Sequence, residues 1–254
     1  MHGKNDGKKV NVTAPAEEGP WLGSGWSLAV IVSAELAIGA GMLRFAQPHQ
    51  AMLAPLAAAP QVSVPAWTDE PSLPDADRVA RWAAATGNAA RRPFLIVDKA
   101  NARVMAFDAQ GRLAHSTPTL LGFARGDDSP AGIGTKAIAD ITPEERITPA
   151  GRFIARRGVN ATGEDIVWVD YDAAVSMHRV RATNPAERRL ERLASETIED
   201  NRISWGCINL PVAFYEGVVR PMVDAGQTVV YVLPDTKPLT EVFALGARPR
   251  HASL

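Results

Sequence analysis

Short runs rich in valine, isoleucine and phenylalanine recur between residues 94 and 233, and turn-forming residues separate them. The expected strands cover residues 94–98, 103–108, 113–121, 152–156, 166–171, 174–178 and 227–233. Ala100 and Asn101 fit a hairpin turn between the first two strands, and the glycine- and aspartate-rich residues 122–134 fit a loop. Many short strands with turns between them predict an all-β sandwich or a β-rich mixed domain.

One helix is expected ahead of the strands, over residues 75–85. Val79, Trp82 and Ala83 share one face of this helix, and Gly87 marks its end. The apolar face is expected to pack on the domain that follows.

A second helix is expected to begin after Asn184. Asn184 is a good N-cap, Pro185 fits the first helical position, and Glu187 completes a start that resembles a capping box. Its apolar stripe consists of Leu190, Leu193, Ala194 and Ile198, and its arginines and glutamates are expected to form a solvated face. A lid over a site and a structural crossover are both open interpretations of this helix.

Residues 26–43 form an almost continuous apolar run, which is long enough to span a bilayer with the help of its flanks. Trp21 and Trp26 suit one membrane interface, and three lysines before the run against Arg44 after it favour an N-terminus on the inside. Glu35 in the middle of the run costs a few kcal/mol on insertion scales and argues against a simple anchor.

Two alternatives to a membrane anchor remain open. One is a cleaved signal peptide with its small-residue site at residues 57–59, although Pro60 makes that site poor. The other is a helix buried in the protein core. The anchor and the signal peptide both deliver the rest of the chain across a membrane.

The stretch from Ile203 to Pro211 contains the only cysteine of the chain, Cys207. A lone cysteine excludes an internal disulfide framework and a multi-cysteine metal site. Gly206 allows close approach of a substrate or a positive φ, and Pro211 fits the first turn of a following helix, whose N-terminus would favour a thiolate at Cys207. The alternative is a buried cysteine that acts as a small hydrophobe.

Three segments resemble one family, in the order in which that family has them. Residues 204–209, Ser-Trp-Gly-Cys-Ile-Asn, resemble the Ser-His-Gly-Cys-hydrophobic-Asn/Arg signature of the L,D-transpeptidase catalytic domain (YkuD-like). Residues 147–153 resemble the Thr-Pro-x-Gly-x-Phe segment of that family, and residues 175–178 resemble the strand that ends in its catalytic histidine. The resemblance covers about residues 93–234 and implies a β-sandwich with small helices.

One position departs from the family pattern. Trp205 stands where the family usually has a histidine immediately before the Gly-Cys pair. An indole donates one hydrogen bond and stacks, but it cannot accept a proton. The proton acceptor of the family is the upstream histidine, which corresponds to His178, so the departure leaves the mechanism in place and bears on substrate preference and turnover.

Only two of the five histidines, His115 and His178, belong to the expected domain. His115 falls in an expected strand and is interpreted as a surface or packing residue. His178 ends the strand that resembles the family, and a cysteine nucleophile needs such a base. His178 is therefore the candidate general base, with a satisfied structural histidine as the alternative.

The resemblance implies a thioacyl mechanism. His178 takes the thiol proton, and the Cys207 thiolate attacks a peptide carbonyl, with backbone N–H groups around Gly206 and Cys207 as oxyanion donors. Ser204, Trp205 and Asn209 shape the site, and Ser176 is a further candidate partner. The implied substrate is a peptidoglycan stem tetrapeptide, cleaved before a terminal D-alanine, and no cofactor or metal is implied.

Three functions follow as hypotheses. The first is an L,D-transpeptidase of the bacterial cell envelope, the second an L,D-carboxypeptidase or amidase with water as acceptor, and the third an inactive wall-binding module. The net charge of −1 gives no basic patch for nucleic acid. Membrane contact is expected through residues 26–43, with the catalytic domain in the periplasm.

The expected division of the chain has five parts. These are a polar cytoplasmic tail (1–20), an anchor or signal segment (21–45), a Pro/Ala-rich linker with a short helix (46–90), the catalytic domain (91–235) and a C-terminal tail (236–254). Repeated prolines favour an extended linker.

Overall fold

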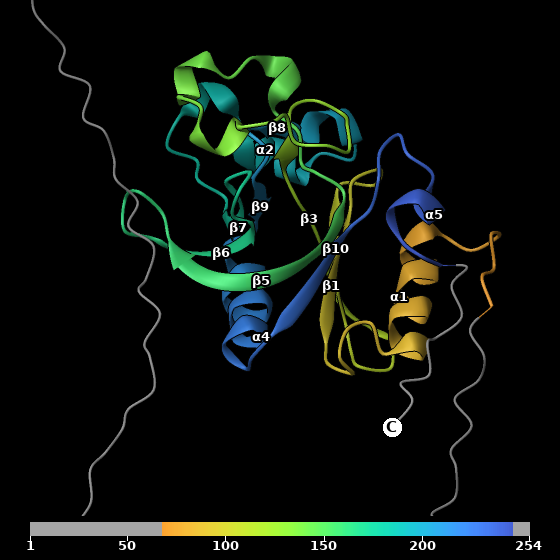
Figure 1. The fold of residues 1–254 in the computed structure, drawn as a ribbon. Helices are drawn as coiled ribbons and strands as arrows, with labels where there is room; N and C mark the ends of the chain where they lie inside the picture. Colours follow the sequence, from red (N-terminus) through yellow and green to blue (C-terminus); the bar gives the residue numbers. More distant parts are fainter. Residues whose placement is uncertain (1–67, 246–254) are drawn as a thin grey trace, which may run out of the picture. The chain divides into compact units, whose positions relative to one another are not determined.

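The computed structural model describes residues 68–245, most of them in strands and short helices (Figure 1). The strands are β1 (Phe94–Asp98), β2 (Arg103–Phe107), β3 (Leu113–Pro118), β4 (Leu121–Gly122), β5 (Gly151–Val159), β6 (Asp165–Asp170), β7 (Val175–Arg179), β8 (Arg202–Ser204), β9 (Ile208–Leu210) and β10 (Thr228–Val232). Eight strands form one mixed sheet in the order β3-β2-β1-β10-β5-β6-β7-β9, and β4 pairs with β8. The predicted mainly β fold with short helices is confirmed.

Strand β5 joins the two halves of the sheet and is strongly curved (Figure 1). Residues 151–155 pair with β10, and residues 156–159 pair with β6. Leu120 and Asn209 exchange two backbone hydrogen bonds of 3.0 and 2.8 Å, which bring the chain after β3 against edge strand β9. The sheet is therefore curled in the manner of a barrel.

The main hydrophobic core contains residues from both halves of the sheet. Its buried members include Leu95, Val97, Val104, Val167, Val175, Met177, Ile208, Leu210, Val230 and Val232. A helical segment made of α3 (Val212–Phe214), η6 (Tyr215–Val219) and α4 (Arg220–Asp224) adds Phe214, Tyr215 and Val219. Because side chains alternate along a strand, Val175 and Met177 face this core while Ser176 and His178 face away from it.

A second core forms where helix α1 (Asp75–Thr86) packs with β1, β2 and β10. Val79, Trp82 and Ala83 are buried there, and Gly87 ends the helix with a φ of 69°. This is the helix and the face predicted from the sequence. Trp82 meets Tyr231 edge to face at 6.0 Å between ring centroids.

The chain after β10 contributes to the same core. Helix α5 (Leu239–Val242) is followed by Phe243 and Leu245, and both of these residues are buried in it. The division of the chain into five parts stays a prediction, with the expected membrane segment outside the described residues. Within residues 68–245, no helix is both long and apolar enough to cross a membrane.

The second predicted helix is wrong in its extent. The segment consists of the 3-10 turn η4 (Pro185–Glu187), helix α2 (Arg189–Ala194) and the 3-10 turn η5 (Ile198–Asn201). Arg188 has a φ of 50°, which interrupts the helix, and Ser195 is extended. Of the expected stripe Leu193 is buried, whereas Leu190 is 57% exposed, because a six-residue helix cannot present the whole stripe to one core.

The long connection from β4 to β5 carries three short 3-10 turns. These are η1 (Ile133–Thr135), η2 (Ile138–Asp140) and η3 (Pro143–Glu145). The connection then returns to the sheet at residues 147–149, directly before β5.

Candidate active site

Cys207 lies in a tight turn between β8 and β9, and Ser204 holds this turn. The Ser204 hydroxyl donates to the carbonyl of Cys207 at 2.6 Å and accepts the N–H of Gly206 at 3.1 Å. Ser204 is buried, so its hydroxyl is committed to the turn. The structure therefore places Ser204 as a residue that shapes the backbone around the thiol.

Gly206 has a φ of 122°, and a Cβ atom there would lie 2.7 Å from the carbonyl oxygen of Ile147. Both observations explain why this position needs glycine. The N–H of Gly206 is already bonded to Ser204, whereas the N–H of Cys207 meets no acceptor among the described residues. Of the two expected oxyanion donors, Cys207 is thus the one with a free N–H group.

The expected helix start at Pro211 is confirmed, but strand β9 separates the helix from Cys207. Strand β9 occupies residues 208–210, and the helix begins only after Pro211, with Val212 as its first residue. Residues 208–210 form a strand because β9 pairs with β7 on one side and with Leu120 on the other. A helix terminus is therefore not what favours the thiolate.

His178 and Cys207 come together because β7 and β9 are parallel neighbours, with His178 opposite Asn209 in the register. The Nδ1 atom of His178 lies 2.8 Å from the carbonyl oxygen of Arg179 and donates to it, which leaves Nε2 as the proton acceptor. The Sγ atom of Cys207 lies 3.6 Å from Ser176 Oγ and 3.6 Å from the Ala174 carbonyl oxygen. Ser176, on the same face of β7 as His178, therefore borders the thiol as well.

The two titratable groups shift one another in the direction of an ion pair. Burial alone raises the pKa of the Cys207 thiol, but the hydrogen bond and charge of His178, with smaller help from Ser176, hold that pKa below its ordinary value. Burial likewise lowers the pKa of His178, but its interactions with Cys207 prevail and raise it. This arrangement favours a thiolate next to an imidazolium, the nucleophilic state of a cysteine.

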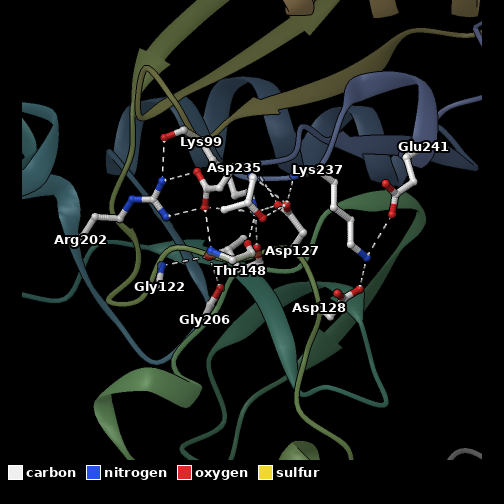
Figure 2. A network of polar contacts seen from close by, with 12 residues as sticks. Lys99, Gly122, Asp127, Asp128, Thr148, Arg202, Gly206, Asp235, Lys237 and Glu241 are labelled. Carbon is white, nitrogen blue, oxygen red and sulfur yellow. Dashed lines mark hydrogen bonds and ion pairs between the residues drawn. The ribbon is translucent and has the colours of Figure 1, made fainter.

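Thr148 connects the turn of Cys207 to the interior of the domain (Figure 2). Its hydroxyl donates to the carbonyl of Gly206 at 2.8 Å and accepts the N–H of Gly122 at 2.9 Å. Thr148 is fully buried and belongs to the segment that resembles the Thr-Pro-x-Gly-x-Phe motif. It positions Gly206, and through it Cys207.

Behind Thr148 lies a cluster of buried charges (Figure 2). The Lys99 ammonium group donates to the carbonyl of Thr148 at 2.9 Å and to Asp127 at 2.9 Å, and it lies 3.3 Å from Asp235. Arg202 pairs with Asp235 at 2.7 Å and donates to the carbonyl of Lys99. The cluster fixes four chain segments in one place.

Asp127 is the acceptor with the most partners in this cluster. Besides Lys99, its carboxylate accepts the backbone N–H groups of residues 235–237 and the hydroxyl of Thr236, at 2.6 to 2.8 Å. Burial raises the pKa of Asp127, but the Thr236 hydroxyl, the backbone N–H groups and Lys99 together hold it well below its ordinary value. The Asp127 carboxylate is therefore held in its ionised form by several donors.

Replacing Thr148 by valine is expected to destabilise the protein by about 2 kcal/mol, because two buried backbone groups lose their partner. The alkylation of Cys207 by iodoacetamide should slow as well, since Gly206 is no longer fixed. Urea unfolding and alkylation rates measure the two effects. Thr148→Ser keeps the hydroxyl and is the control, and equal losses in both variants would contradict the role of the hydroxyl.

Trp205 forms part of the rim of the site and is 39% exposed. The guanidinium carbon of Arg146 lies 3.5 Å from the centroid of the indole ring, a cation–π contact. Phe123 is another exposed aromatic residue nearby, since its N–H donates to the carbonyl of Ser204. Nothing in the sequence pattern pointed to Arg146, because stacking across two loops leaves no periodic signal.

Asn209 is fully buried and lies beneath the site. Its amide donates to the carbonyl of Cys207 at 3.1 Å, and its oxygen accepts from Arg189 Nη1 at 2.6 Å. The side chain of Arg189 is only 12% exposed and also pairs with Glu187. The prediction that the charges of this helix form a solvated face is therefore wrong for Arg189.

No family model matches the chain, and no curated protein matches it. Among solved structures, the chain is similar to a mutant of the helical cell shape determining protein Pgp2 from Campylobacter jejuni, with a TM-score of 0.37 and 14% identity. The match covers 65% of this chain and 58% of that protein, so it spans less than two thirds of the latter. The function is therefore inferred from the residues of the site and not from this similarity.

Proposed function

We propose that the protein is a cysteine acyltransferase of the L,D-transpeptidase type, acting on peptidoglycan stem peptides. The observation that carries this proposal is the pairing of Cys207 with His178, whose Nδ1 atom is fixed on the Arg179 carbonyl so that Nε2 is free to accept a proton. A thiol with a lowered pKa next to a base is what nucleophilic catalysis requires.

A second support comes from the three segments that resemble the family. They are far apart in the sequence but meet at one place. Thr148 from the first segment bonds to Gly206 in the third, and His178 from the second lies on the strand next to Asn209. A chance resemblance gives no reason for the three segments to converge around one thiol.

The proposed reaction has two halves. His178 Nε2 takes the proton of Cys207, the thiolate attacks the peptide carbonyl, and the negative charge develops on an oxygen near the free N–H of Cys207. The C–N bond then breaks, the imidazolium gives its proton to the leaving amine, and a thioester remains. An acceptor amine attacks this thioester while His178 takes its proton, and the thiol is released.

Ser176 is proposed to support the first half. Its hydroxyl lies 3.6 Å from the sulfur and can donate to the thiolate but cannot replace His178 as a base. An envelope location remains part of the proposal and rests on the apolar run of residues 26–43. Stem peptides would then be encountered on the far side of the membrane.

Intact-protein mass spectrometry tests this function. Full-length wild type, Cys207→Ala and His178→Gln are incubated with a stem tetrapeptide that ends in D-alanine. The wild type is expected to gain the mass of the peptide without D-alanine, or to release D-alanine on turnover, and Cys207→Ala should do neither. His178→Gln should acylate about 100-fold more slowly or worse, as expected for loss of a general base.

An added amine separates the acceptors. A peptide product joined to the amine supports transpeptidation, whereas a free tripeptide alone points to the carboxypeptidase. No adduct and no D-alanine, with Cys207 still alkylated by iodoacetamide, would contradict an acyltransferase and favour a binding module.

A further inference from the structure

Arg189 is a cation held beside the Cys207–His178 pair by contacts that fix its direction. Nε pairs with Glu187, and Nη1 donates to the Asn209 side chain at 2.6 Å. Its Nη2 group has no hydrogen-bond partner among residues 68–245. An arginine that is 12% exposed and keeps one free donor is arranged to receive a ligand atom.

The sheet places Arg189 on the His178 side of the site. Asn209, which anchors its guanidinium, is the register partner of His178 on the neighbouring strand. His178 delivers the proton to the leaving amine, so the leaving residue must lie on the His178 side of the thiol. The free donor of Arg189 thus belongs to the half of the site that holds the leaving group.

We propose that Arg189 binds the carboxylate of the leaving residue, so that the site selects acyl donors whose scissile bond is the last one of the peptide. This inference rests on the proposed function. The carboxylate of a terminal amino acid is separated from the leaving nitrogen only by the α-carbon, and a guanidinium group matches its geometry. A longer or amidated peptide has no negative charge at this place.

The charge of Arg189 also acts on the pKa of His178, the proposed base. Burial and, more weakly, Arg189 act to lower the pKa of His178, against the larger effect of Cys207 that raises it. A bound carboxylate would offset the positive charge and favour the imidazolium that forms during the attack. Substrate binding and activation of the thiol are coupled in this way.

A pair of small reagents tests the anion site without any peptide. Iodoacetate and iodoacetamide alkylate the same thiolate, so the ratio of their rates is insensitive to the Cys207 pKa and reports the local charge. Arg189→Gln is expected to lower the iodoacetate-to-iodoacetamide ratio about fivefold, as for unit charges a few ångström apart in water. Arg189→Lys should keep most of the ratio.

Arg192→Gln is the matched control, since it removes the same charge from the same segment. Arg192 donates to the carbonyls of Glu187 and Asp200 and makes no contact with Asn209. Its ratio is expected to stay within about twofold of wild type, because its guanidinium is bound to those two carbonyls and not to the Asn209 side chain beside the Cys207–His178 pair. An unchanged ratio in Arg189→Gln, or an equal change in both variants, would overturn the anion site.

The second test uses two donors, a stem tetrapeptide with a free terminal carboxylate and its C-terminal amide. The wild type is expected to prefer the free acid, and Arg189→Gln to lose about tenfold or more of this preference, mainly through KM. Acylation of Cys207 without any such preference would overturn this inference and leave the acyltransferase standing. An Arg189-dependent iodoacetate ratio without acylation by either peptide would keep the anion site and contradict the acyltransferase.

Discussion

Asp127→Ala is expected to lower the free energy of unfolding by about 3–5 kcal/mol, the usual result of removing one partner from a buried ion pair. The variant removes one of the carboxylates that neutralise the buried Lys99 ammonium group. It also leaves the backbone N–H groups of residues 235–237 without their acceptor. Urea unfolding of the purified protein measures the change. Cys207 should also become less reactive, because Lys99 helps to hold Thr148.

Asp128→Ala is the matched control for this variant. The two carboxylates are adjacent in the chain, but Asp127 is 1% exposed and Asp128 is 76% exposed. Asp128 pairs with Lys237 at the surface, a contact worth about 0–1 kcal/mol. Similar losses in the two variants would contradict the view that the buried cluster stabilises the domain.

His178→Gln is expected to move the pH dependence of Cys207 alkylation to higher pH. In the wild type His178 lowers the pKa of Cys207 against the effect of burial, and Cys207 raises the pKa of His178, so each group favours the charged form of the other. Without the imidazole, burial remains and raises the pKa of the thiol, so less thiolate is present at pH 7 than in the wild type. Alkylation at pH 7 should slow about tenfold, while rates above pH 9 converge.

Iodoacetamide reactions are quenched at set times between pH 5 and 10 and analysed by mass spectrometry. They give the pH profiles of the wild type and of His178→Gln. The control is His115→Gln, since His115 is exposed on β3, where its register partner is Ala106 of β2. Its profile should match that of the wild type. A wild-type midpoint at or above that of His178→Gln would show that the imidazole does not stabilise the thiolate.

The local patterns of the sequence predicted the parts of the fold that depend on neighbours in the chain. Strand β1 was predicted with the bounds the structure gives it, and α1 with its buried face. The helix after Asn184 was predicted too long, because propensity does not reveal a left-handed residue at Arg188. The helix start at Pro211 was predicted correctly, but strand β9 between it and Cys207 was not, because that strand depends on tertiary pairing.

The candidate site was predictable only where a motif marked it. Cys207 and His178 were named from their motifs, and the structure brings them together, although their catalytic roles stay predictions. Lys99 and Asp127 were missed because a single charged residue next to a strand or in a loop resembles a solvated one. Arg189 was missed for the same reason, as its partner Asn209 is 20 positions away.

The buried charge cluster makes the activation of the Cys207 thiol depend on folding of the whole domain. Asp127 and residue 235 are 108 positions apart, and Arg202 reaches a carbonyl 103 positions away. Contacts over such sequence distances close late, since loop entropy must be overcome first. A chain that is still being made therefore carries Cys207 as an ordinary thiol. Its nucleophilicity emerges only with the finished domain, which limits oxidation of the thiol before folding is complete.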